Sequence, residues 1–198
     1  MLPGEPTERF VQSLATALAS QTTHTMLTPA IRAGVDAGVR RLCDKGRVVL
    51  ASTSADGPAP RPALARMPAQ DFIADTQLHD EVFGPAALIV DAADLAEVAQ
   101  VLEAVGGSLT ATLWGVDEPT PAHLALVRTA TRLAGRVLFA SVPTGVAVCA
   151  AQQRGGPWPS STQPATTCVG WAATDRFLRP VAYQDAPDRL QQRGGQPA

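Results

Sequence analysis

Charge of either sign is scarce in this chain, and long apolar runs are absent. Charged residues make up 17% of the 198 positions, and the formal net charge is −2. No cluster of basic residues indicates contact with nucleic acid or with an acidic membrane surface. The apolar stretches are far too short to cross a bilayer. We therefore expect neither a nucleic-acid partner nor a membrane partner.

Targeting signals and disulfide patterns are also lacking. The first five residues contain no basic segment followed by an apolar one, so we expect no signal peptide. Three cysteines, at widely spaced positions, are too few and odd in number for a disulfide framework. We expect a reducing, cytoplasmic location. Cys43 and Cys149 lie in apolar sequence and should be packed and inert, and Cys168 is the most reactive candidate, although an inert role is favoured there too.

The motifs of a self-sufficient active site are missing as well. No Gly-x-Gly-x-x-Gly follows a predicted strand, and the sequence has no phosphate-binding P-loop. The three histidines, His24, His79 and His123, have no metal-ligand spacing with a cysteine or carboxylate, so we expect no metal site. No nucleophile-elbow pattern supports a Ser/His/Asp site.

What the chain has is apolar material in helical and strand patterns, with 45% hydrophobic residues. Helical spacing, capping residues and stop signals predict four helices. They cover residues 7–18, residues 28–46, a stretch that starts between 91 and 94 and ends at 106, and residues 120–135. Short apolar runs predict strands at residues 48–50, 86–90, 109–114 and 136–140. Alternating strands and helices between residues 86 and 140 predict an α/β fold, with a parallel sheet covered by helices on both faces.

The proline- and glycine-rich segments at residues 53–70 and 153–167 are predicted to be irregular, and the second is long enough to be functional or mobile. Residues 176–184 could form a strand, which Pro180 would confine to an edge or a bulge. The polar residues 186–198 should form a disordered tail.

One short segment carries a family resemblance. Glu81-Val82-Phe83-Gly84-Pro85, followed by an apolar strand, resembles the Glu-x-Phe-Gly-Pro motif of the aldehyde dehydrogenase superfamily. Residues 107–111 and 134–138 are similar to two strands of the same superfamily. Further segments in matching order resemble one branch of it, the 2,5-dioxovalerate (α-ketoglutarate semialdehyde) dehydrogenases: residues 26–31, 143–146, 155–159, 166–170 and 176–184. The resemblance implies a partial catalytic (thiol) domain at residues 1–170, and a C-terminal helix and oligomerisation strand at residues 171–185.

The resemblance also implies a reaction. In the family a cysteine thiolate attacks an aldehyde, hydride passes to NAD(P), and water releases the acid. Pro3-Gly4 resembles the Pro-Gly that follows the catalytic cysteine, which would place that cysteine just ahead of Met1. The general-base glutamate, the oxyanion asparagine and the dinucleotide-binding domain would also lie outside this chain. The chain alone should therefore be inactive and should bind neither NAD nor NADP tightly.

Seven positions take candidate roles from the resemblance. Glu81 matches the glutamate that binds the nicotinamide ribose, and Phe83 matches the aromatic residue beside the nicotinamide. The alternative is a buried turn with a solvated carboxylate. The substrate side would include these five residues: Pro143, Thr144, Gly145, Val146 and Arg154. The alternative there is an ordinary surface loop.

The implied partners are a small aldehyde, with a carboxylate-bearing semialdehyde as one candidate, and other protein chains. Ala150 and Arg154 stand where this branch usually has histidine, so the identity of the substrate stays open. The segment 177–184 resembles the family's oligomerisation strand and predicts either a homo-oligomer or association with a full-length paralogue. A non-catalytic oligomerisation or regulatory module is therefore the alternative to an enzyme segment.

Overall fold

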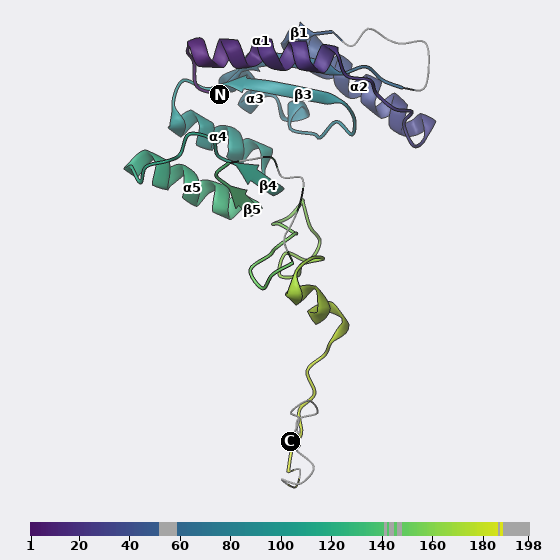
Figure 1. Ribbon diagram of the computed structural model, residues 1–198, viewed down its shortest axis with the longest axis vertical. Coiled ribbons are helices and arrows are strands. Elements are labelled where there is room, and N and C mark those ends of the chain that lie inside the picture. Colours follow the sequence, from purple (N-terminus) through teal and green to yellow (C-terminus); the bar gives the residue numbers. More distant parts are fainter. Residues whose placement is uncertain (52–58, 141, 143–144, 146–147, 186, 188–198) are drawn as a thin grey trace.

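The computed structural model describes residues 1–51, 59–140, 142, 145, 148–185 and 187. Five helices and two small sheets form the folded body, and the C-terminal residues extend away from it (Figure 1). The first sheet has the order β1-β2-β3, and the second pairs β4 with β5. In the described part of the chain, no helix is both long enough and apolar enough to cross a membrane.

The first sheet consists of β1 (Arg47–Leu50), β2 (Ala63–Pro68) and β3 (Ala86–Asp91). Strand β1 runs antiparallel to β2, whereas β2 and β3 are parallel, with Ala63 opposite Ala86 and Met67 opposite Val90. Because successive side chains of a strand point to opposite faces, this sheet has two buried faces to cover.

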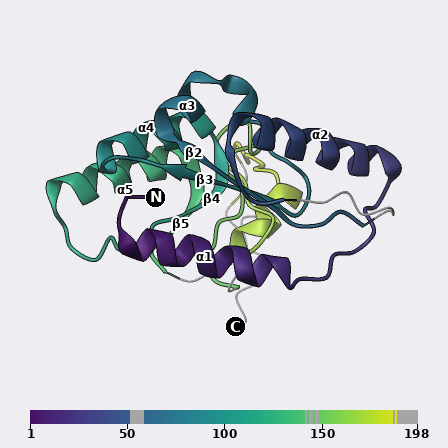
Figure 2. The ribbon, with the colours of Figure 1, turned by 90° about the horizontal axis from the view of Figure 1, so that it is seen from above.

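Helices cover both of these faces. On one face, α1 (Glu5–Ala19) places Val11 against Leu64 and Ile89. On the other face, α2 (Pro29–Lys45), α3 (Ala69–Ala74) and part of α4 (Leu95–Val105) enclose a second apolar cluster. Figure 2 shows α1 and α2 on opposite sides of the strands. The predicted α/β class and its covered sheet are confirmed.

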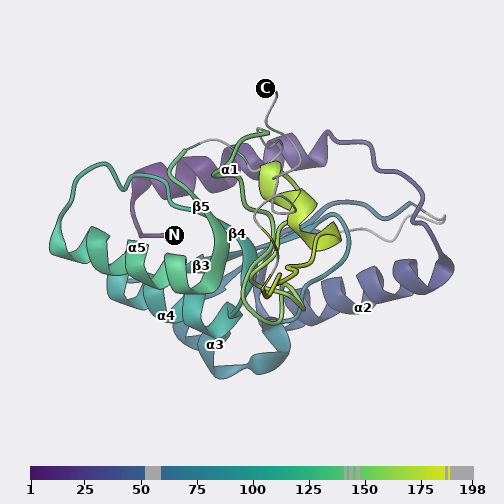
Figure 3. The ribbon, with the colours of Figure 1, turned by 90° about the horizontal axis from the view of Figure 1, so that it is seen from below.

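The second sheet is smaller and is covered by α4 and α5 (Pro121–Leu133). Its strands, β4 (Ser108–Thr112) and β5 (Ala134–Leu138), are parallel. Helix α4 therefore contributes to the apolar clusters of both sheets. In Figure 3, as in Figure 1, β4 lies nearer to β3 than β5 does. The order predicted for residues 86–140 is present, but β3 and β4 belong to different sheets and are not paired.

The capping residues act as the sequence predicts in three helices. Hydroxyl oxygens of Thr28 and Thr120 accept hydrogen bonds from the backbone N–H groups three residues later, at 3.2 and 3.1 Å. The carboxylate of Asp94 does the same for α4, at 2.8 Å. The prediction for α1 was wrong in detail, because the helix begins at Glu5 and the Thr7 hydroxyl instead donates to the Leu2 carbonyl at 2.5 Å.

Residues 53–70 were predicted to be irregular, and for their second half this was wrong. Strand β2 occupies the centre of the first sheet, and all but its last residue are buried. Pro62 immediately precedes the strand and Pro68 is its last residue, opposite Asp91, so prolines flank the buried residues 63–67 and do not interrupt them. The proline content therefore marks the ends of this strand and does not exclude it.

The C-terminal part follows its predictions only in part. Residues 153–167 contain no helix or strand, as predicted, and a 3₁₀ helix, η2, spans Trp171–Phe177. Because η2 extends to Phe177, the predicted start of a strand at residue 176 was wrong. Residues 178–185 form no strand with the described part of this chain. Pairing of residues 178–184 with another subunit stays a prediction. Almost all of the predicted disordered tail lies outside the described residues.

Candidate functional site

The turn before β3, residues Glu81–Pro85, is held against α2 by close packing. A methyl group in place of the Gly38 hydrogen would lie 2.7 Å from a Val82 methyl, so Val82 sits directly over this glycine. Gly84 lies in similarly tight contact with Val35, which is 1% exposed. The Val82 carbonyl also accepts a 2.7 Å hydrogen bond from the Gly84 N–H. These contacts leave little freedom for the backbone of the turn.

The same packing explains why the two candidate cofactor residues point to solvent. Val82 and Gly84 face α2, so the residues that alternate with them face outward. Phe83 is 73% exposed and Glu81 is exposed. Neither side chain has a hydrogen-bond or ion-pair partner among the described residues. The alternative of a buried Phe-Gly-Pro turn does not hold for Phe83, whereas the solvated carboxylate of Glu81 is present.

The candidate substrate residues lie in the irregular region after β5. Arg154 is exposed, and its backbone N–H donates to the buried Thr167 hydroxyl at 2.9 Å. The Gly145 carbonyl accepts a hydrogen bond from Arg136 at 3.2 Å. Pro143, Thr144 and Val146 lie outside the described residues. No hydrogen bond between described residues joins Gly145 or Arg154 to Glu81, so the proposed cofactor and substrate sides are not directly linked.

The segment around Gly155 is docked on the second sheet by glycine-to-backbone contacts. A Cβ atom at Gly135, the second residue of β5, would overlap the Gly155 carbonyl. A Cβ at Gly107, just before β4, would overlap the Trp158 carbonyl, and one at Gly156 would overlap the Ser108 carbonyl. Only glycine permits this approach, so the Gly-Gly-Pro-Trp-Pro segment is anchored at its backbone while Trp158 is 73% exposed.

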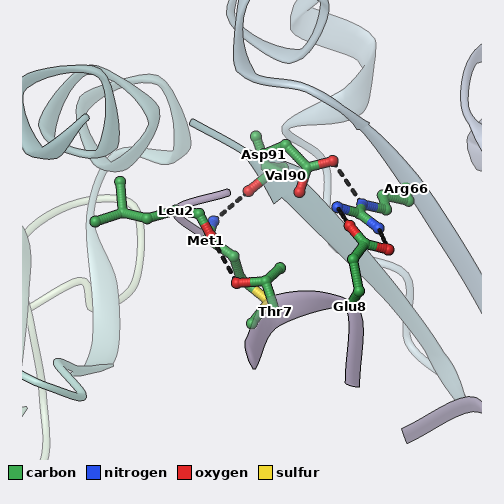
Figure 4. Close-up of polar contacts among 7 residues, drawn as sticks. All are labelled: Met1, Leu2, Thr7, Glu8, Arg66, Val90 and Asp91. Carbon is green, nitrogen blue, oxygen red and sulfur yellow. Dashed lines mark hydrogen bonds and ion pairs between the residues drawn. The ribbon is translucent and has the colours of Figure 1, made fainter. Parts of the chain in front are cut away.

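An ion-pair cluster around one buried arginine, which the sequence did not reveal, lies at the other end of β3 (Figure 4). The Arg66 guanidinium, 8% exposed, contacts both carboxylate oxygens of Glu8 at 2.9 and 2.7 Å. Its Nε atom donates to Asp91 at 2.5 Å. Strand alternation places Arg66 and Asp91 on the face that α1 covers, so Glu8 reaches them from that helix. The available signal was a single arginine inside the apolar run of residues 63–67.

The charges of this cluster support one another. Hydrogen bonds from Arg66 lower the pKa of Glu8. Hydrogen bonds to the carboxylates of Glu8 and Asp91 raise the pKa of Arg66. The second oxygen of Asp91 is buried without a hydrogen-bond partner. The residue Asp91 also lines an open depression of about 360 Å³, together with Pro3, Pro68 and Glu97. This depression is at the opposite end of β3 from Glu81 and is not the predicted cofactor site.

The cysteines differ in environment, and none lies in a cluster of metal-ligating residues. Burial, with a smaller effect of Asp44, raises the pKa of the half-buried Cys43, as expected for an inert thiol. Cys149 and Cys168 are both exposed. The predicted packing of Cys149 was therefore wrong, because its apolar neighbours in sequence do not enclose it. Among the described residues, no group of three His, Cys, Asp or Glu side chains could hold a metal ion.

Comparison with characterised proteins extends the resemblance to nearly the whole chain. The sequence is 42% identical over 197 residues to α-ketoglutaric semialdehyde dehydrogenase 2 of Azospirillum brasilense, covering 96% of this chain and 37% of that enzyme. It is also 42% identical over 114 residues to the α-ketoglutaric semialdehyde dehydrogenase of Acinetobacter baylyi, covering 58% of this chain and 22% of that enzyme. The chain is therefore similar to one segment of aldehyde dehydrogenases. The predicted resemblance is confirmed.

Solved structures of aldehyde dehydrogenases and related enzymes share the fold. A variant of proline utilization A from Bradyrhizobium japonicum covers 81% of this chain with a TM-score of 0.62 and 20% identity, over 17% of its own length. A 1-pyrroline-5-carboxylate dehydrogenase covers 77% with a TM-score of 0.58 and 22% identity, over 30% of its length. At this identity the likeness concerns the fold alone. No model of a protein family matches the sequence.

The chain matches only part of each relative, so the activity of the whole relatives does not transfer to it directly. The chain spans 37% and 22% of the two semialdehyde dehydrogenases that it matches. Its own contribution is the set of described features: the outward pair Glu81 and Phe83, the anchored segment around Gly155, and the Arg66 cluster.

Proposed function

We propose that this chain is the part of an NAD(P)-dependent semialdehyde dehydrogenase that supplies the nicotinamide-ribose contacts and one side of the substrate pocket. The observation that carries this proposal is the 42% identity to α-ketoglutaric semialdehyde dehydrogenase 2 over 96% of the chain. The substrate class is a small aldehyde that carries a carboxylate, and the product is the corresponding acid.

The exposed pair on the turn before β3 fits a nicotinamide nucleotide. The Glu81 carboxylate has acceptor capacity for two ribose hydroxyl groups, since no described residue uses it. The exposed face of Phe83 can pack against a flat ring. The close packing of the turn against α2 restrains the backbone that carries both residues before the nucleotide arrives, which lowers the entropic cost of binding. When bound, NAD(P) would supply the hydride acceptor.

The nucleophile of the reaction is proposed to lie outside this chain. Cys43 is half-buried with a raised pKa, which disfavours the reactive thiolate. Among the described residues, no cationic or basic side chain is hydrogen-bonded to the sulfur of Cys149 or Cys168, and the Cys168 thiol donates to the Arg154 carbonyl at 3.9 Å. Arg154, whose exposed side chain makes no ion pair with a described carboxylate, is the candidate partner for the carboxylate of the substrate.

The decisive experiment is a complementation assay. The 198-residue chain is mixed with the part of the Azospirillum brasilense enzyme that it does not match, expressed as a separate polypeptide. We expect aldehyde-dependent formation of NADH or NADPH with α-ketoglutarate semialdehyde from the mixture and none from either part alone. Activity of the 198-residue chain by itself would contradict the proposal that the catalytic thiol lies elsewhere.

Matched variants separate the proposed roles in this assay. Glu81→Gln and Phe83→Ala should weaken nucleotide binding and raise the KM for NAD(P), while leaving unfolding of the chain unchanged because both side chains are exposed. Arg154→Gln should raise the KM for the carboxylate-bearing aldehyde more than that for a neutral aldehyde. Equal effects of Arg154→Gln on both aldehydes would favour the surface-loop interpretation of this residue.

A non-catalytic association module is the second candidate. The observation that favours it is a run of exposed apolar side chains that begins at the last residue of η2 and continues beyond it: Phe177, Leu178, Val181 and Tyr183, which are 55–83% exposed. Such a run is typical of a segment that another protein chain covers. Association with a full-length paralogue through residues 178–184 would not require the missing nucleophile.

A further inference from the structure

The edge of β3 that faces the second sheet is open along most of its length. The Pro85 carbonyl accepts a hydrogen bond from the Ala63 N–H of β2 at 2.9 Å. Backbone groups of a strand point alternately to its two neighbours, so those of Ala87, Ile89 and Asp91 also point toward β2. The N–H and C=O groups of Leu88 and Val90 point to the other edge. Strand β4, the next strand in space, pairs with β5 and not with β3.

The first residue of the chain shows what this edge accepts. The Met1 nitrogen donates to the Val90 carbonyl, and the Ala92 N–H donates to the Met1 carbonyl at 2.9 Å (Figure 4). Met1 is thus hydrogen-bonded to the residues on either side of Asp91, to the carbonyl of Val90 and to the N–H of Ala92. This is the hydrogen-bond pattern between opposite residues of two parallel strands. Met1 thus lies in the position of a strand residue running in the same direction as β3.

A charged amine is poorly suited to this position, since a strand residue there would present a neutral amide. Burial lowers the pKa of the Met1 amino group, against a smaller opposite effect of Asp91. Helix α4 packs against the apolar clusters of both sheets and so forms a common floor under β3 and β4. Apolar residues flank the open edge on both faces, with Leu88 and Val90 on one and Ile89 on the other.

We propose that the free edge of β3 accepts a further parallel strand, apolar on both faces, which inserts between β3 and β4 and is supplied by the complementary part of an aldehyde dehydrogenase chain. The strand would run toward Met1. One of its residues, opposite Ile89, would donate to the Leu88 carbonyl and accept from the Val90 N–H, two residues before the position that Met1 occupies opposite Asp91. The occupant is inferred from the share of the relatives that this chain leaves uncovered. The identity of this donor rests on the proposed function, whereas the strand-accepting edge rests on the backbone contacts.

The edge is tested without any partner by extending the chain. A Thr-Val-Ile-Val segment fused ahead of Met1 should occupy the edge, whereas a Gly-Ser-Gly-Ser segment of equal length should not. Amide hydrogen exchange read by NMR gives an internal control, because the amides of Ala87 and Ile89 already face β2. We expect exchange at Leu88 and Val90 to slow by about tenfold in the apolar fusion, with no change at Ala87 and Ile89. Unchanged exchange at Leu88 and Val90 would overturn the strand-accepting edge.

The donor is tested by mixing the unextended chain with the unmatched part of the Azospirillum brasilense enzyme. A complex of one copy of each, with the same slowing at Leu88 and Val90, supports the proposed donor. The Thr-Val-Ile-Val fusion, whose edge is already filled, should fail to form that complex. A complex that forms without protection of these two amides overturns the donor, and so does a homodimer of this chain that protects them by itself. An inactive complex with both amides protected would reject the proposed function and retain the edge.

Discussion

Single glycines on α2 decide whether the candidate cofactor turn can dock. Gly38 lies under Val82, whereas a Cβ at Gly34 on the same helix would meet nothing within 4 Å. Replacing either glycine with alanine should gain about 1 kcal/mol of helix propensity. At Gly38 the added methyl also overlaps Val82, which costs about 1–3 kcal/mol. We therefore predict that Gly34→Ala raises the free energy of unfolding and that Gly38→Ala lowers it relative to Gly34→Ala.

Urea unfolding of the two variants measures this difference directly, since helix propensity contributes equally to both. Equal stability of the two proteins would show that Val82 moves aside without cost. The exposure of Phe83 in the Gly38 variant, followed by proton NMR of its ring, would report whether the turn has shifted.

The pair of Glu8 and Arg66 predicts a dependence of stability on pH. The pKa of Glu8 is lowered below its ordinary value of 4.5, so the folded state binds the proton more weakly than the unfolded chain. The stabilisation is therefore fully present above pH 4.5 and is lost as the pH falls through the folded-state pKa. Arg66 keeps its charge throughout this range.

The measurement compares urea unfolding of the native chain and Glu8→Gln at pH 7 and pH 3.5. Other carboxylates titrate in both proteins, so the quantity that matters is the difference between them. We expect Glu8→Gln to be less stable than the native chain at pH 7 and the difference between the two to be smaller at pH 3.5. A constant difference at both pH values would mean that the Glu8 carboxylate does not interact with Arg66 as a charge.

Elements were predictable from the sequence where local signals agreed. Helices α2, α4 and α5 have a capping residue, helical apolar spacing and a stop signal in the right order, and all three were found. Strand β2 was missed because the prolines before and at the end of it gave a loop signal, while its buried character depends on neighbours distant in sequence. Exposure of Cys149 also depends on tertiary context, which apolar neighbours in sequence do not report.

The candidate site shows the same division. Outward placement of Glu81 and Phe83 depends on contacts of Val82 and Gly84 with α2, more than 40 residues earlier in the chain, which no local pattern contains. The motif resemblance found the two residues, and the packing explains their direction. The Arg66 cluster joins α1, β2 and β3, so only the tertiary fold could bring its three side chains together.

The contact between Gly135 in β5 and the segment around Gly155 predicts how that segment can be released from the sheet. Gly135→Ala places a methyl group where the Gly155 carbonyl lies, and a backbone atom cannot rotate away as a side chain can. We expect the segment to detach from β5 while the apolar cluster under α4 and α5 stays intact. Trypsin should then cut after Arg154 faster than in the native chain, with little change in thermal unfolding of the body.

Gly145→Ala serves as the matched control, since a Cβ there meets nothing within 4 Å. It should leave the rate of cleavage after Arg154 unchanged. Equal cleavage rates in the native chain and Gly135→Ala would contradict the anchoring role of that glycine.

At the scale of the whole molecule, the described residues form a folded body with two regions that they do not cover themselves. One is the open edge between β3 and β4, and the other is the extended segment after η2 (Figure 1). A single extended segment buries almost nothing against its own chain, as the 79% exposure of Tyr183 shows. Its apolar side chains are stabilised only when another chain covers them, so its conformation depends on assembly.

Association through this segment is therefore predicted to be separable from folding. Leu178→Ser combined with Tyr183→Ser removes two exposed apolar side chains without touching the clusters of the body. Light scattering should show a lower average mass for this double variant than for the native chain, whereas the midpoint of thermal unfolding at low concentration should be the same. The control Leu27→Ser changes a side chain that is 88% exposed at the start of α2 and should not alter the mass. If the double variant associates as strongly as the native chain, the contact must involve the open sheet edge instead, and the Thr-Val-Ile-Val fusion should then be the variant that abolishes it.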